Sequence, residues 1–276
     1  MKTVSTFQRL KDNNEKIVML TAYDYSTAKL LEESEIDGIL VGDSLAMVAL
    51  GYENTYNITI DEMLIFIQAV SRGAKNSFII GDMPFMSYNL NLAQGLENAS
   101  KMIKAGANAI KLEGCNDYIL SLVKRCVESG IPVLGHLGFT PQLMNTIGGH
   151  KIQGKTAESI ELILESAKKL EEAGCFAVVL ELLPAESAKY ITDNLKIPTI
   201  GIGAGVNCSG QIVVTDDITG KFTDFTPKFV KKYTNLHDIV LSGIQEYKNE
   251  VKRELFPSPE ESFELSENEK EKLTQA

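Results

Sequence analysis

Acidic side chains end several of the short apolar runs in this 276-residue sequence, and three of them follow successive runs: Asp43, Asp82 and Glu113. Carboxylates crowded together repel strongly unless a cation lies among them. One such carboxylate is often only a loop cap, but three in succession favour a hard divalent cation such as Mg2+, which takes a few carboxylates plus water and substrate oxygens. We predict a Mg2+ site with Asp43 and Asp82 as direct ligands and Glu113 as a direct or water-mediated one.

Lys111 lies two residues before Glu113. Side chains two apart on a strand share a face, and the apolar Ile110 and Leu112 should face the helices, so the two charged side chains should point inward together. Lys111 has two functional interpretations, an electrostatic clamp for a substrate carboxylate or a Schiff-base nucleophile. Pairing with Glu113 keeps the amine charged and favours the clamp.

Glu181 is a fourth strand-end carboxylate, predicted to lie across the barrel from the others and flanked by Leu180, Leu182 and Leu183. Apolar surroundings raise a carboxyl pKa toward the range of a general base, and we predict that role for Glu181, with a structural salt bridge as the alternative. His136 also lies at a strand end. We predict that it orients a substrate or cofactor group, and a hydrogen-bonded core histidine is its alternative.

Two glycine-rich segments suggest nucleotide sites but lack the required context. The run from Gly149 to Thr156 matches the Walker A pattern, yet about a dozen loop residues separate it from the preceding strand, so the strand-to-helix turn that cradles phosphate is missing. The run from Gly201 to Gly205 lacks the GxGxxG order. We predict that the first segment does not bind ATP and that the second is a loop at the mouth of the fold.

The elements that would position these residues are short apolar strands alternating with amphipathic helices, eight times over. The strands begin about 30 residues apart over much of the chain, as βαβ units require. Eight units predict an α/β fold of the single-domain (β/α)8 TIM-barrel type, with chemistry at the carboxyl ends of the strands. The seventh unit is irregular, because residues 203–211 are too few for an outer helix. The predicted strands are Ile17–Leu20, Gly38–Asp43, Phe78–Asp82, Ala109–Glu113, Val133–Leu137, Ala177–Leu182, Thr199–Ile202 and Ile212–Thr215. The predicted helices are Ser26–Glu35, Asp61–Lys75, Leu92–Ala105, Asp117–Ser129, Thr156–Ala173 and Ala185–Asn194.

Charge and composition exclude some classes of binding partner. A formal net charge of -10 leaves no basic surface for nucleic acid, and no apolar run indicates export or a membrane span, so we expect a cytoplasmic protein. The four cysteines show no CxxC spacing and are predicted to be reduced thiols. We assign residues 1–250 to the barrel. Residues 251–276, with seven glutamates, form a tail that wraps the surface or a neighbouring subunit, or is partly disordered.

Several segments, in one order along the chain, resemble the ketopantoate hydroxymethyltransferase family, whose barrel is of the phosphoenolpyruvate mutase type. The resemblance implies that Asp43, Asp82 and Glu113 form the metal site, and that Ser44 and Lys111, together with the two aspartates, hold a 2-oxo acid. The matching segments are Met19–Tyr25, Val41–Leu45, Gly81–Met86, Lys111–Gly114, Gly135–Gln142 and Ile200–Gly205.

The resemblance also implies a reaction, in which Glu181 is the catalytic base. The base removes the C3 proton of 3-methyl-2-oxobutanoate, and the metal-stabilised enolate attacks the one-carbon unit of 5,10-methylenetetrahydrofolate to give 2-dehydropantoate, in pantothenate biosynthesis. A homo-oligomer, a decamer, is implied as well. Four positions depart from the family pattern, none of them a proposed contact to metal or substrate: Ala46, Ser209, Thr215 and Glu261.

Two other interpretations of the chain stay open. One is a metal-dependent carbon–carbon lyase of the phosphoenolpyruvate mutase or isocitrate lyase type. That type usually carries a Cys-Gly-His loop for protonation, and the sequence has no such tripeptide. The other is a non-catalytic ligand-binding barrel, which the intact strand-end carboxylates argue against.

Overall fold

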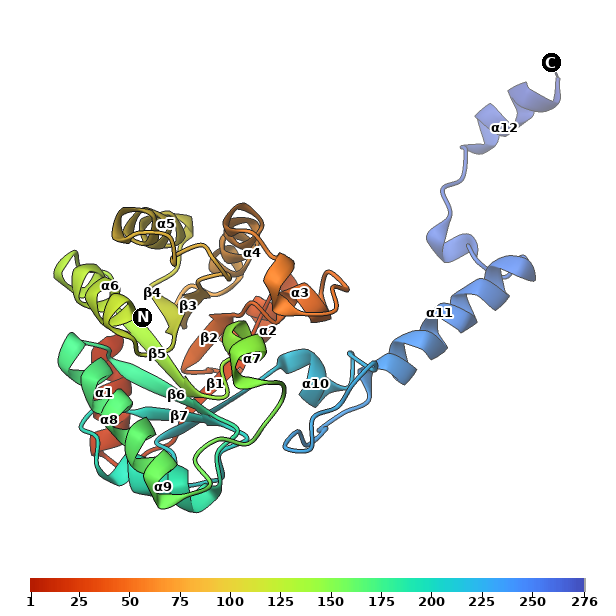
Figure 1. Cartoon of the computed structure of the whole chain (residues 1–276). Helices are drawn as coiled ribbons and strands as arrows, with labels where there is room; N and C mark the ends of the chain where they lie inside the picture. The colour runs from red at the N-terminus through yellow and green to blue at the C-terminus, as the bar shows by residue number, and fades with distance from the viewer. Residues whose placement is uncertain (276) are drawn as a thin grey trace.

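Eight parallel strands close into a barrel in the computed structural model, which describes residues 1–275 (Figure 1). Each strand pairs with the next along the chain, and β1 pairs with β8 to complete the ring. The predicted (β/α)8 architecture is therefore confirmed. The strands are β1 (Ile17–Thr21), β2 (Gly38–Val41), β3 (Phe78–Asp82), β4 (Ala109–Glu113), β5 (Val133–Gly138), β6 (Ala177–Glu181), β7 (Thr199–Ile202) and β8 (Gly210–Val213).

The strand bounds differ most from the sequence prediction at β8, which begins at Gly210 rather than Ile212. Gly210 pairs with Ile17 of β1, and a Cβ atom at this position would lie 2.5 Å from the Ile17 carbonyl oxygen. The close approach of the two strands therefore needs a glycine. Because glycine is rare in strand interiors, the sequence pattern alone does not reveal it as the start of a strand.

The helices surround the barrel, and the six long helices predicted from sequence are present to within two residues at each end (Figure 1). Side-chain caps fix the starts of all of them except Ala185–Asp193, as at Asn91, which accepts a hydrogen bond from the Gln94 backbone N–H at the start of α5 (Leu92–Ala105). The helices and 3-10 turns are α1 (Val4–Asp12), α2 (Tyr25–Glu33), α3 (Leu45–Val48), η1 (Thr55–Asn57), α4 (Ile60–Gly73), α5 (Leu92–Ala105), α6 (Asp117–Glu128), η2 (Pro141–Leu143), α7 (Met144–Ile147), α8 (Ala157–Ala173), α9 (Ala185–Asp193), α10 (Thr215–Thr219), α11 (Leu236–Lys252), η3 (Pro259–Glu261) and α12 (Glu267–Thr274).

Apolar side chains form two layers, one inside the ring of strands and one between the strands and the outer helices. Helix α1 joins the inner layer through Phe7, which is fully buried. Its ring centroid lies 5.3 Å from that of Phe78 and 5.5 Å from that of Phe176, so three aromatic rings close the amino-terminal end of the barrel. Polar inward side chains are thereby left to the opposite, carboxyl end.

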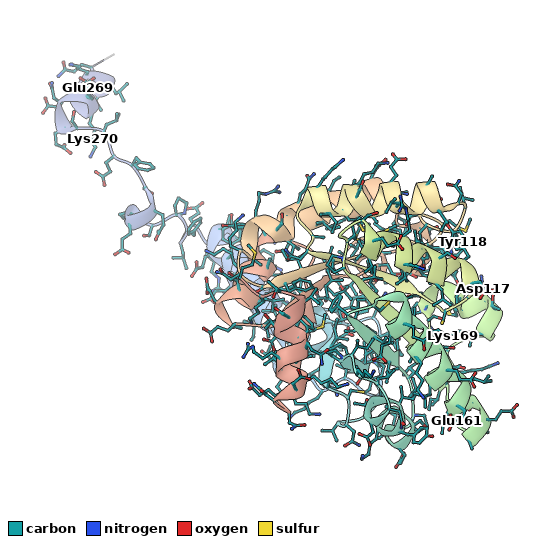
Figure 2. All side chains as sticks on the ribbon, turned by 90° about the vertical axis from the view of Figure 1, so that its left-hand side faces the viewer. Asp117, Tyr118, Glu161, Lys169, Glu269 and Lys270 are labelled. Carbon is teal, nitrogen blue, oxygen red and sulfur yellow. The ribbon has the colours of Figure 1, made fainter. Side chains whose placement is uncertain are left out.

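The segment from Asn235 onward leaves the barrel. Helix α11 and helix α12 project away from the ring of strands, and Glu269 and Lys270 of α12 lie far from the barrel helices (Figures 1 and 2). Every residue from Asn235 to Asn249 is exposed except Leu236. The division of the chain at residue 250 stays a prediction. Within residues 1–275, no helix combines the length and the apolar character that crossing a membrane requires.

Candidate active site at the carboxyl ends of the strands

Three carboxylates and one lysine meet at the carboxyl ends of β2, β3 and β4, where Asp43, Asp82, Lys111 and Glu113 are all buried. Lys111 Nζ lies 2.7 Å from Asp82 Oδ1 and 3.5 Å from Glu113 Oε1. The Asp43 backbone N–H donates a hydrogen bond of 3.1 Å to Asp82 Oδ2. Lys111 and Glu113 thus point into the barrel, as their two-residue spacing predicts.

The charges of this cluster do not balance. Burial lowers the pKa of Lys111, but the negative charges of Asp82, Glu113 and Asp43 outweigh burial and raise that pKa above its usual value, so the amine stays protonated. At Asp43, burial and the charge of Asp82 raise the pKa well above the usual range, although Lys111 acts in the opposite direction. One ammonium group is therefore too little positive charge for three buried carboxylates.

The donor set fits a divalent cation, although the side chains are not arranged as a complete metal site. Across the described part of the chain, no three His, Cys, Asp or Glu side chains converge closely enough to hold an ion, and the Lys111 ammonium group bridges Asp82 and Glu113. Hard oxygen donors with excess negative charge are nevertheless what Mg2+ binds in proteins. The ligand roles of Asp43, Asp82 and Glu113 stay predictions.

His136 of β5 connects this cluster to Glu181. Its Nδ1 lies 3.2 Å from Glu113 Oε1 and its Nε2 lies 3.1 Å from Glu181 Oε2, but neither contact has the alignment of a good hydrogen bond. Burial and the Lys111 charge lower the pKa of His136, whereas the two carboxylates raise it and prevail, giving a pKa of about 9. His136 is therefore an imidazolium at neutral pH, held between two carboxylates.

The surroundings of Glu181 differ from the sequence prediction in two ways. Glu181 does not stand apart from the acidic cluster, because only the His136 ring separates it from Glu113. The leucines also do not enclose its carboxylate. Leu180 and Leu183 pack in the layer between strands and helices, and the Glu181 side chain is 15% exposed. Alternation along the strand explains this, since Leu180 and Glu181 necessarily face opposite sides of the sheet.

Several polar side chains of the site carry no strong sequence signal. Ser44 lies directly after Asp43, and its Oγ is 2.8 Å from the hydroxyl oxygen of Tyr23, which follows β1. Gln142, in η2 after β5, donates from its backbone N–H to Glu113 Oε2 at 3.0 Å and from Nε2 to Asp43 Oδ2 at 3.0 Å. Their positions in the segments quoted above are the only cue, and residue type alone does not single them out.

A large, mostly apolar cavity of about 1440 Å³ opens beside Glu181 at the ends of β6 and β7. The Gly149–Thr156 segment borders it between α7 and α8, where Thr156 caps α8. The segment therefore precedes a helix but follows another helix rather than a strand, and the absence of ATP binding stays a prediction. Gly203 and Gly205 line the same cavity, so the end of the second glycine-rich run is a loop at the mouth, as predicted, whereas Gly201 and Ile202 still belong to β7.

The sequence compares closely with known enzymes over nearly its whole length. The family model described as ketopantoate hydroxymethyltransferase matches residues 1–259. A 3-methyl-2-oxobutanoate hydroxymethyltransferase of Clostridium novyi (strain NT) is 51% identical over 98% of each chain. One of Thermotoga maritima (strain ATCC 43589 / DSM 3109 / JCM 10099 / NBRC 100826 / MSB8) is 51% identical over 94% of this chain and 96% of its own.

More distant solved structures share the fold. A phosphonopyruvate hydrolase solved as a complex with oxalate and Mg++ has a TM-score of 0.61 at 12% identity and covers 100% of this chain and 95% of its own. A 2,3-dimethylmalate lyase, a member of the PEP mutase/isocitrate lyase superfamily, has a TM-score of 0.59 at 13% identity, with 100% and 99% coverage. The likeness to these structures shows a shared barrel fold, and the match over residues 1–259 shows that the chain belongs to the ketopantoate hydroxymethyltransferase family.

Proposed function

We propose that the chain is a 3-methyl-2-oxobutanoate hydroxymethyltransferase that uses 5,10-methylenetetrahydrofolate and a divalent cation, Mg2+ by preference, and supplies 2-dehydropantoate to pantothenate biosynthesis. The observation that carries this proposal is the position of Glu181. Its carboxylate contacts His136 on the side of the buried charged cluster and lines the open apolar cavity on the other. At that boundary the Glu181 carboxylate can reach a small 2-oxo acid held in the cluster. The deprotonated acid would then face a larger reactant bound in the cavity.

The charged cluster would hold the oxo acid. Lys111 is buried and cationic, and Ser44 offers a hydroxyl group beside Asp43, so both suit a substrate carboxylate. A divalent cation held by Asp43, Asp82 and Glu113 would polarise the ketone and stabilise the negative charge of the enolate. The acid end would thereby be fixed, and C3 of the substrate would be directed toward Glu181.

Glu181 would remove the C3 proton, and His136 would keep the carboxylate oriented from its other side. The methylene carbon of the folate would gain one bond to the resulting carbon nucleophile and one to the oxygen of water, while both of its carbon–nitrogen bonds break. The two folate nitrogens would take up the proton from C3 and one proton from the water. The folate would lie in the cavity beside Glu181. Phe225 and Phe229 offer apolar surface there, and Lys155 and Lys228 suit its anionic tail.

An assay of folate-dependent hydroxymethylation tests the proposal. Protein treated with a chelator and freed of metal should lose turnover of 3-methyl-2-oxobutanoate, and added Mg2+ should restore it, because Lys111 alone supplies too little positive charge for the three carboxylates and cannot polarise the ketone as a cation would. Full turnover after exhaustive metal removal would contradict the metal role. Folate-independent cleavage of a carbon–carbon bond in a 2-hydroxy or 2-oxo diacid would instead support a lyase.

Lys111 should act as a charged clamp and form no Schiff base. Its ammonium group is paired with Asp82 at 2.7 Å, and the raised pKa leaves almost no free amine to attack a ketone. Borohydride added in the presence of 3-methyl-2-oxobutanoate should leave the protein mass unchanged by mass spectrometry. A stable adduct mapped to Lys111 would move the enzyme to the lysine-dependent aldolases.

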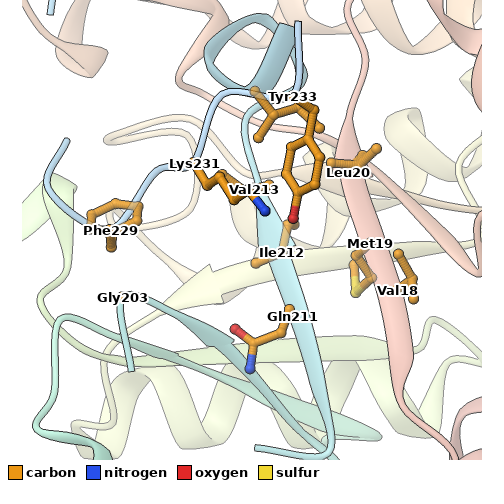
Figure 3. A pocket seen from close by; sticks show the side chains of 11 residues that line it. Val18, Met19, Leu20, Gly203, Gln211, Ile212, Val213, Phe229, Lys231 and Tyr233 are labelled. Carbon is orange, nitrogen blue, oxygen red and sulfur yellow. The ribbon is translucent and has the colours of Figure 1, made fainter. Parts of the chain in front are cut away.

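We also propose that the protein works in the cytoplasm as a homo-oligomer, of ten subunits by family resemblance, in which α11 packs on another copy. Val240, Ile244, Tyr247 and Val251 form one exposed apolar stripe along this helix. On the barrel, Val18 of β1 is 46% exposed and borders a cavity of about 420 Å³ that Lys231 and Tyr233 overhang (Figure 3).

All four cysteines are free thiols, which suits a reducing compartment such as the cytoplasm.

Ile244→Asp should shift the mass measured by light scattering to a smaller assembly, because the new charge lies in the middle of the apolar stripe. Asn249→Asp, which adds the same charge on another face of α11, is the matched control and should keep the wild-type mass. An unchanged mass for Ile244→Asp would exclude α11 from the interface.

A further inference from the structure

Gln142 is a buried glutamine whose polar groups all have partners within the acidic cluster or beside it. Its backbone N–H donates to Glu113 Oε2 at 3.0 Å. Its Nε2 donates to Asp43 Oδ2 at 3.0 Å and to the Met83 carbonyl oxygen at 2.9 Å. Its Oε1 accepts a hydrogen bond of 2.8 Å from the Tyr88 hydroxyl. One residue in a short turn therefore contacts two carboxylates from the ends of different strands, Asp43 through its side chain and Glu113 through its backbone.

Tyr88 determines which way the amide faces. Its hydroxyl oxygen lies 3.4 Å from the Glu113 backbone N–H, a donor, so the hydroxyl proton is directed to Gln142 Oε1. With the amide oxygen held by Tyr88, the amide nitrogen faces Asp43 as a donor. A flipped amide would set its oxygen against Asp43 Oδ2 and the Met83 carbonyl oxygen, which a buried site does not tolerate.

These contacts occupy one oxygen of each carboxylate. Asp43 Oδ2 is held by the Gln142 side chain and Glu113 Oε2 by the Gln142 backbone. In the described part of the chain, no other hydrogen bond uses the Asp43 side chain, so Oδ1 is its free oxygen. Fixed in this way, Asp43 presents a single oxygen to a cation, whereas the other oxygen of Glu113, Oε1, already faces Lys111 and His136. Such single-oxygen ligands suit Mg2+, which demands octahedral geometry, and disfavour Ca2+, which takes more oxygens and often both of one carboxylate.

We propose that Gln142, oriented by Tyr88, is a positioning residue that restricts Asp43 to one oxygen and thereby makes the site selective for Mg2+ over Ca2+. The inference rests on the metal site of the proposed function. The inference adds Gln142 as a hydrogen-bond partner of the metal ligands that controls which ion the ligands bind. Hydrogen-bond partners of metal ligands commonly have this role.

Calorimetric titration with Mg2+ alone and with Ca2+ alone tests the inference on the full-length protein. Gln142→Met keeps the volume but removes the amide, and Tyr88→Phe removes only the hydroxyl that orients it. Both variants should bind Mg2+ about 10–100-fold more weakly, as expected for a lost neighbour of a metal ligand. Ca2+ affinity should fall less or rise, so the Mg2+ to Ca2+ affinity ratio decreases in both.

Tyr118→Phe is the matched control. Its hydroxyl donates to the Tyr88 carbonyl oxygen at 2.6 Å and does not touch the amide, and its side chain lies on α6 at the outside of the barrel (Figure 2). The control should keep the wild-type ratio. If wild type binds Mg2+ and Tyr88→Phe keeps both its folded state and the wild-type ratio, the inference is wrong and the proposed function stands. If wild type binds neither ion, the metal role itself fails and the inference with it.

Discussion

Glu181→Gln should slow exchange of the C3 hydrogen of 3-methyl-2-oxobutanoate with deuterated solvent by about 10²–10⁴-fold, the usual cost of losing a general base. The exchange needs proton abstraction but no folate, so it isolates the step assigned to Glu181. The variant should still bind Mg2+ and the oxo acid, because the acidic cluster lies on the far side of His136. Nuclear magnetic resonance of the C3 position, with Mg2+ present, measures the rate.

Glu186→Gln is the control for that experiment, since Glu186 lies in the next helix, is exposed, and loses the same charge by the same substitution. It should exchange at the wild-type rate. Exchange at the wild-type rate in Glu181→Gln would mean that another group removes the proton.

Asp82→Ala should lose measurable turnover together with Mg2+ binding, and it should also unfold more easily. Its carboxylate lies 2.7 Å from Lys111 Nζ in a fully buried pair. Its removal breaks a buried ion pair, but Glu113 stays beside Lys111, so the loss in the free energy of unfolding should stay below the about 3–5 kcal/mol of a fully unpaired buried charge. Urea denaturation measures the stability loss, and calorimetry with Mg2+ measures the loss of binding.

Asp82→Asn separates the metal role of this residue from its structural role. The amide keeps an oxygen that can accept from Lys111 or from the Asp43 backbone N–H, so more of the stability should survive. It removes the negative charge, so Mg2+ affinity and turnover should still collapse. Turnover and Mg2+ affinity of Asp82→Asn near those of wild type would contradict direct ligation by Asp82.

The sequence predicts best what depends on neighbours along the chain. The inward direction of Lys111 and Glu113 follows from two-residue alternation, and the strand bounds Phe78–Asp82 and Ala109–Glu113 follow from apolar runs ended by a charge. The same alternation shows that Leu180 cannot wall the carboxylate of Glu181. That error comes from treating sequence neighbours as neighbours in space.

Contacts between strands depend on register, which apolar periodicity does not contain. Glu113 pairs with His136, and Gly138 pairs with Glu181, and these two offsets bring the imidazole between the carboxylates. Gln142 reaches Asp43 across 99 positions of sequence, through a turn that carries no periodic pattern. The course of α11 away from the barrel is equally hidden, because its apolar stripe would look the same on a helix packed against its own strands.

The aromatic rings that close the amino-terminal end of the barrel determine how reactants reach the site. With Phe7, Phe78 and Phe176 filling the amino-terminal end, reactants enter and leave by the opposite end. In the proposed arrangement the oxo acid lies deep, and the folate lies above it beside Glu181. The small acid then enters before the folate, and the hydroxymethylated product departs after the spent folate. Because one end of the barrel is closed, reactants bind and products leave in a fixed order at the other end.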